Sequence, residues 1–147
     1  MKKEVHIKTL RFRIKDCHAK VLRDMATSVN QVWNYCNELS HRSIRERRKF
    51  LSGYDLQKYT RGASKELGIN SATIQMVGHQ YVESRKQHKK IKLRWRSSFG
   101  KKRALGWIPF RHDCIKYENG FIIHNRHKIK VWDSYGLDKY TLGSGDF

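Results

Sequence analysis

The residues of this chain most suited to binding chemistry are the cations of residues 85–103, RKQHKKIKLRWRSSFGKKR. This stretch contains ten lysines and arginines and no carboxylate, and Trp95 and Phe99 stand among them. Cations at this density suit the phosphates of a nucleic acid, and rings between them suit stacking on bases or riboses. The alternative, a solvated helix end and a flexible loop, leaves the repulsion among the cations uncompensated. We expect nucleic-acid contacts from Lys90, Lys92, Arg94, Arg96, Phe99, Lys101, Lys102 and Arg103.

A second basic patch precedes it, with Glu46 as its one carboxylate. If residues 40–51 are helical, Arg45, Arg48 and Lys49 share one face of that helix. The alternative is an exposed helix with one ion pair along it. We expect contacts with a nucleic-acid backbone from Arg42, Arg45, Arg48 and Lys49.

Candidates for catalysis or metal binding are sparse. The 13 carboxylates stand singly, with no pair at a spacing typical of a two-metal site. His124 and His127 are three residues apart beside a strand, where that spacing puts side chains on opposite sides of a sheet. The three cysteines include no C-x-x-C pair, so the sequence supports neither a disulfide framework nor a zinc ribbon. We expect no catalytic residue, metal or cofactor in this chain.

Composition agrees with a polyanion partner. The 147 residues carry 32 lysines and arginines against 13 acids, a formal net charge of +19, and 12% are aromatic. A basic chain this rich in aromatics is typical of a folded nucleic-acid-binding protein. A ribosomal-type protein, a solubilising surface and an anionic-membrane binder are the alternatives. The start, MKKEVHIKTL, lacks a signal-peptide core, and no apolar run approaches the roughly 20 residues that span a bilayer. We therefore expect a cytoplasmic protein without a membrane partner.

The elements that must position these residues follow the order strand, helices, strands. LRFRI alternates as a strand with Arg11 and Arg13 in solvent, and Asp16 is a suitable N-cap for the helix that follows. Helical patterns cover residues 16–39, 40–51, 54–67 and 70–90. Strand patterns cover 92–96, 106–110, 114–124, 127–132 and the tail, with Asn119-Gly120 as a hairpin turn.

This order predicts an α+β fold. A lone strand before a helical block usually joins the later strands, which makes the helices an insertion in a β unit. We expect a discontinuous β domain of residues 1–15 and 91–147, and a helical domain of residues 16–90.

The same order of motifs resembles the N-terminal half of TnpB-type proteins, encoded by bacterial and archaeal insertion sequences and similar to type V CRISPR effectors. The matching pieces are LRFRI, VNQVWNYCNEL, GYDLQKYT, NSATIQ, LRWRSSFGKKRALGWIPF and the NGFI hairpin. The resemblance implies a barrel-like β wedge domain with an inserted helical recognition domain. It also implies an RNA-guided DNA endonuclease that resides with the bacterial or archaeal nucleoid when bound, with guide RNA and target DNA as partners.

Family members continue into a RuvC-like nuclease with a magnesium site and a zinc ribbon, which have no counterpart in this sequence. The resemblance therefore implies the binding half, without cleavage, and a separate RuvC-like half as a further partner. It carries the reading of a target-adjacent DNA motif to Tyr54 and Gln75, and Ser71 lies one turn before Gln75 on the same helix face. Glutamine can bond adenine bidentately; the alternative is that Tyr54 caps a helix and Gln75 is an exposed residue without this role. The alternatives are a DNA-binding regulator of a mobile element that needs no RNA, and a remnant of a decayed element.

Overall fold

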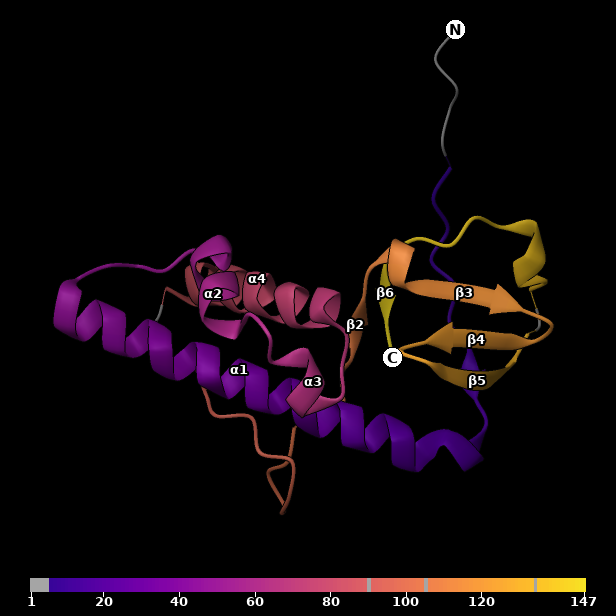
Figure 1. The fold of residues 1–147 in the computed structure, drawn as a ribbon, viewed down its shortest axis with the longest axis horizontal. Coiled ribbons are helices and arrows are strands. Elements are labelled where there is room, and N and C mark those ends of the chain that lie inside the picture. Colours follow the sequence, from indigo (N-terminus) through magenta and orange to yellow (C-terminus); the bar gives the residue numbers. More distant parts are fainter. Residues whose placement is uncertain (1–5, 90, 105, 134) are drawn as a thin grey trace, which may run out of the picture.

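The computed structural model describes residues 6–89, 91–104, 106–133 and 135–147. It is an α+β fold in which helices gather at one end and strands at the other (Figure 1). The helical end is built on one long helix, and α4 (Ser71–His88) packs along it. Of the predicted site residues, Lys90 lies outside the described residues.

The long helix, α1 (Ala19–Arg47), joins the two helices that the sequence predicted for residues 16–39 and 40–51. Neither proline nor glycine interrupts this stretch, so nothing in the backbone forces a break. Arg48 ends the helix in a left-handed conformation with φ 50°. The predicted N-cap is wrong, because Asp16 lies in a separate 3-10 turn (Asp16–His18) before the helix. The shorter helices are α2 (Gly53–Thr60) and α3 (Ser64–Leu67).

The strands form two small antiparallel sheets. The first has the order β1 (Arg13–Ile14), β5 (His127–Trp132), β4 (Phe121–His124), β3 (Ile115–Glu118). The second pairs β2 (Pro109–Phe110) with β6 (Gly145–Asp146). The strand that precedes the helices therefore joins the later strands, as predicted. The expected barrel is wrong for the described residues, because the sheets stay open at β1 and β3.

Two hairpins build the larger sheet. Asn119 and Gly120, with φ 50° and 84°, form the predicted turn between β3 and β4. A second turn at Asn125 and Arg126, with φ 49° and 66°, was not predicted. It makes His124 and His127 opposite partners across the hairpin rather than residues of one strand, so the reason given for separating them was wrong. His124 is buried and His127 is exposed.

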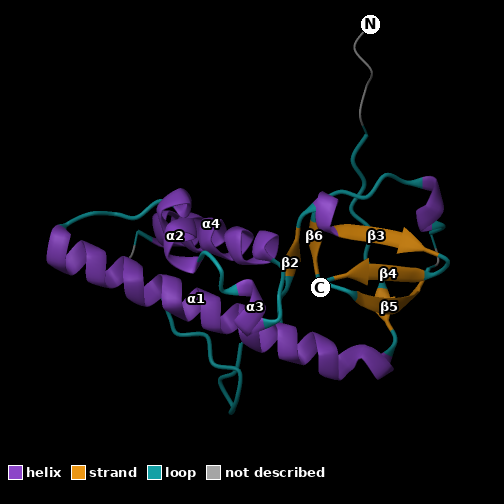
Figure 2. Ribbon diagram, viewed as in Figure 1, coloured by secondary structure: helices purple, strands orange, loops and turns teal. Residues whose placement is uncertain are grey.

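Residues 91–104 form no strand, although the sequence predicted one at 92–96. The chain instead runs back along α1 and turns in a loop below it (Figure 2). Trp107 and Ile108 then join the apolar core between α1, α2 and α4, while a second core lies on the inner face of the sheet. Phe147 packs against both. No helix in the described part of the chain is both long and apolar enough to cross a membrane.

Candidate nucleic-acid interface

Two asparagines of α1 hold the returning segment, residues 91–104, by its backbone, and a third binds its side chains. The side-chain oxygen of Asn37 accepts a hydrogen bond from the amide of Leu93 at 3.0 Å, and its side-chain nitrogen donates one to the Leu93 carbonyl at 2.7 Å. Asn34 does the same for Arg96, at 2.8 and 2.9 Å. Their spacing along α1 puts them on one face of the helix. The amide side chains therefore replace the strand partner that residues 92–96 would otherwise need.

The third asparagine, Asn30, binds side chains instead. It donates to the hydroxyl of Ser98 at 3.0 Å and accepts from the guanidinium Nε of Arg96 at 2.8 Å. Asn30, Asn34 and Asn37 are all buried, and we refer to them as the asparagine ladder. Asn37 is fixed in turn by the hydroxyl of Tyr81 in α4, which donates to it at 2.9 Å.

Arg96 belongs to the interior of this arrangement. Its guanidinium lies 5.6 Å from the ring centroids of both Trp33 and Trp107. Burial lowers the pKa of Arg96 from its ordinary value. An arginine that contacts two indoles and is bonded to Asn30 stabilises the segment, so we do not count it among the residues offered to a ligand.

Arg85, the first cation of the basic stretch, is also internal. It is buried at 3% exposure, and it donates to the Ser40 hydroxyl at 2.7 Å and the Leu51 carbonyl at 2.9 Å. Burial lowers its pKa. Arg85 thus joins the C-terminal part of α4 to α1 and to the chain that follows α1.

The cations of residues 91–104 other than Arg96 are exposed to solvent. Trp95 is 60% exposed and Phe99 79% exposed, which is unusual for rings of their size. The loop is closed at its base by the amide of Ala104, which donates to the carbonyl of Ser97 at 2.7 Å. The exposed set, here named the loop surface, consists of Lys92, Arg94, Trp95, Phe99, Lys101, Lys102 and Arg103.

The loop surface has no acidic counterpart among its own residues. Residues 91–104 include no aspartate or glutamate, and no ion pair within the described part of the chain involves the cations of the loop surface. The asparagine ladder bonds the backbone amides and carbonyls of Leu93 and Arg96 internally. The side chains of the loop surface face outward. The surface therefore offers positive charge and two open rings on a fixed backbone.

The second predicted patch is less uniform. Arg42 lies 3.9 Å from Glu38, and Arg45 lies 3.8 Å from Glu46, both exposed pairs. The expectation that Arg45, Arg48 and Lys49 share a helical face is wrong, because Arg48 and Lys49 lie beyond the end of α1. All four cations are exposed, but the charge of two of them is partly offset.

The predicted motif-reading residues lie along the contact between α2 and α4. Ser71 and Gln75 line a pocket of about 140 Å³ together with Gln57 and Arg61. Tyr54 does not line it; it is 73% exposed near the start of α2. The structure therefore brings together two of the three residues.

His79, one turn beyond Gln75 on α4, was missed in the sequence. Its ring makes an edge contact with Tyr54, with centroids 5.0 Å apart, and its Nε2 lies 2.9 Å from the amide of Gln57. His79 thus connects Tyr54 to the face of α4 that carries Ser71 and Gln75. Ser71, Gln75 and His79 follow one another at intervals of four residues, and this spacing was the available signal.

Comparison with protein-family models, curated proteins and solved structures gave no match. Within the described residues, no group of three or more histidines, cysteines or acids is close enough to hold a metal ion. The buried His124 instead packs beside the rings of Phe110 and Phe147, with centroids 6.1 and 5.3 Å away. Burial lowers its pKa.

Proposed function

We propose that this chain binds nucleic acid through the loop surface, as the RNA- and DNA-binding half of a TnpB-like RNA-guided endonuclease. In this proposal the sheet is the wedge domain and the helices are the recognition domain. The loop surface and the exposed cations at the end of α1 contact guide RNA and the guide–target heteroduplex. Tyr54 of α2, together with Ser71 and Gln75 of α4, contributes to reading the target-adjacent motif.

The observation that carries the proposal is the loop surface itself. Five exposed cations without an acidic partner, beside two rings exposed by 60% and 79%, are costly for a surface with no ligand. The asparagine ladder already holds the backbone of this segment at Leu93 and Arg96, and the bond from the Ala104 amide to the Ser97 carbonyl closes the loop. Binding of a polyanion there therefore loses less conformational entropy than binding to a flexible tail would.

We further propose that this chain binds without cleaving. Its carboxylates stand singly in the sequence, so a two-metal reaction has no candidate ligands here. Cleavage in this proposal belongs to a RuvC-like nuclease outside these 147 residues.

A gel-shift experiment tests the proposal. The chain is titrated against RNA from the end of its genetic element and against duplex DNA of equal length, at low salt. The variant Lys101→Glu/Lys102→Glu/Arg103→Glu should bind the RNA much more weakly. The matched control reverses three exposed cations elsewhere, Arg23, Lys58 and Lys65, and should lose far less.

The outcomes separate the candidates. Unchanged RNA affinity in the loop variant contradicts the proposal. Stronger binding to duplex DNA than to RNA, abolished by the same variant, favours a DNA-binding regulator that needs no RNA.

A further inference from the structure

A second surface of alternating cations and rings lies on the sheet, away from the loop surface. The strand register assigns each residue to one of two faces, because successive side chains alternate. One face carries Ile14, Val131, Ile129 and Ile122 and forms the inner core. The opposite face, here named the outer sheet face, carries Arg13, Trp132, Lys130, Phe121, Glu118, Lys128, Ile123 and Lys116.

The outer sheet face is strongly basic and partly aromatic. Arg13, Lys116 and Lys128 are exposed, and Glu118 is the single acid that the strand register places on it. Trp132, opposite Arg13 on the next strand, is 58% exposed. A tryptophan this open on a sheet whose other face is a packed core adds nothing to that core.

The rings on this face already have cations over them. The ammonium of Lys15 lies 5.0 Å from the centroid of Trp132, and that of Lys130 lies 4.7 Å from the centroid of Phe121. Each ring is thus within reach of a positive group that could bind a phosphate or ribose beside a stacked base.

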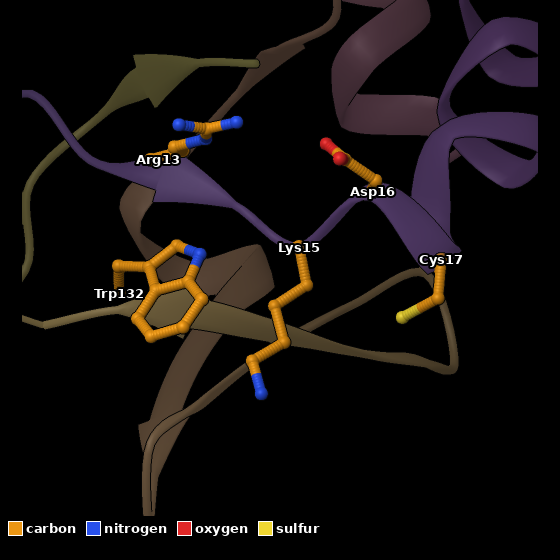
Figure 3. Close-up of a pocket in the computed structure, with 5 residues that line it drawn as sticks. All are labelled: Arg13, Lys15, Asp16, Cys17 and Trp132. Atoms are coloured by element: carbon orange, nitrogen blue, oxygen red, sulfur yellow. The ribbon is translucent and has the colours of Figure 1, made fainter.

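A depression of about 540 Å³ marks the edge of this face at β1. Arg13, Lys15, Asp16, Cys17 and Trp132 line it (Figure 3). In Figure 3 the indole lies beside the side chain of Lys15 and below that of Arg13, and the carboxylate of Asp16 lies farther along the chain, toward the top of the view. The volume of the depression exceeds that of a nucleobase, and Asp16 in its lining supplies an acceptor for an exocyclic amine.

We propose that the outer sheet face is a binding platform for single-stranded nucleic acid, with an unpaired base stacked on Trp132. Arg13 and Lys15 bind the flanking phosphates, and Phe121 with Lys130 holds a neighbouring nucleotide. The inference rests on the proposed nucleic-acid binding and adds to it a second site with a defined substrate class.

The chemistry favours a single strand over a duplex or an acidic protein. Stacking on an exposed indole requires a base with a free face, which a duplex offers only at its ends. An acidic peptide would use the cations but would gain nothing from the open rings. The open, twisted sheet also gives an extended strand a continuous surface across four strands.

Fluorescence anisotropy with a labelled single-stranded RNA of about ten nucleotides, within the usual site size of such platforms, tests the proposal. Trp132→Ala should weaken binding by about tenfold, and Trp132→Phe, which keeps a ring, should retain most of the affinity. Arg13→Ala/Lys15→Ala should reduce the dependence of log affinity on log salt by about 1.4, or about 0.7 for each lost phosphate contact. The control Lys65→Ala removes an exposed cation of α3 and should change neither quantity.

Crosslinking separates this site from the loop surface. A bromouridine-containing RNA should crosslink to Trp132 in the wild type and also in a Lys101→Ala/Lys102→Ala/Arg103→Ala variant. Normal RNA binding in Trp132→Ala, with crosslinks confined to residues 91–103, would overturn the sheet platform and leave the proposed function standing. Absence of RNA binding by the wild type would overturn both. Equal competition by polyglutamate of matched charge would overturn the stacking and favour an acidic protein.

The thermal midpoint of each variant is measured alongside its affinity. Because Trp132 is largely exposed, Trp132→Ala should melt close to the wild type. If it does not fold, Trp132→Phe and the Arg13/Lys15 variant decide the outcome.

Discussion

Replacing Asn34 by alanine should release the loop surface from α1. Asn34 is the centre of the asparagine ladder and makes two hydrogen bonds to the backbone of Arg96, at 2.8 and 2.9 Å. Alanine cannot make either bond and leaves an amide and a carbonyl of Arg96 without these partners. The helix itself should tolerate the change, since alanine is the best helix former.

The expected cost follows from these two bonds. Each is worth about 1 kcal/mol net, and a polar group left unpaired adds a penalty, so we expect a loss of about 2–3 kcal/mol in the free energy of unfolding. For a chain of this size that corresponds to a thermal midpoint lower by about 5–10 °C. RNA affinity should fall as well, because the ligand must then order the segment on binding.

Thermal denaturation followed by circular dichroism, together with hydrogen exchange at the Arg96 amide, measures both effects. Gln31→Ala, at an exposed position on the same helix, is the matched control and should stay within about 0.5 kcal/mol of the wild type. If Asn34→Ala melts like this control and the Arg96 amide keeps its protection, the asparagine ladder does not hold the segment and the reasoning is refuted.

Three further predictions concern the scaffold. Gly53→Ala should destabilise the fold by about 1–3 kcal/mol in denaturant titrations, because the new methyl group would overlap the ring of His79; adding His79→Ala should recover much of this loss, and a simple sum of the two effects would argue against the contact. Burial raises the pKa of the Cys36 thiol to about 12, so it should not react with a thiol reagent at pH 8 until the protein unfolds; rapid labelling in the native state would contradict its burial. The amide of Leu137 and further hydrogen bonds lower the pKa of Asp133, so the stability that its charge contributes should be present at neutral pH and disappear as pH falls below about 4. Asp133→Asn should therefore be less stable than the wild type at neutral pH and equally stable in acid. A difference in the free energy of unfolding that persists in acid would contradict the prediction.

Local chemistry in the sequence was enough to predict much of the fold. The alternation in HKIKVW and the Asn119-Gly120 turn specified β5 and the first hairpin, because these signals act over a few residues. The helical pattern of residues 70–90 likewise specified α4, where Ile74, Val77 and Tyr81, at three- and four-residue spacing, are buried. The second hairpin was missed because Asn125-Arg126 lacks the glycine that usually marks such a turn.

Two failures, at KLRWR and at Arg96, share a cause, because the partners of these residues are distant in the sequence. KLRWR alternates like a strand, yet its backbone bonds go to asparagines about 60 positions earlier. Arg96 looked like a ligand-binding cation because nothing in its neighbourhood shows that Trp33 and Trp107 flank it. The regular spacing of asparagines in VNQVWNYCNEL was visible, but its meaning required the returning chain.

The central claim is that an ordered, unpaired cationic loop binds a polyanion, and the salt dependence of RNA affinity tests it most directly. The wild type and Lys101→Ala/Lys102→Ala/Arg103→Ala are titrated with the same single-stranded RNA over a range of salt concentrations. The account predicts that the slope of log affinity against log salt becomes shallower by about 2 in the variant, since three phosphate contacts at about 0.7 each are lost. An identical slope and affinity in the two proteins would contradict it.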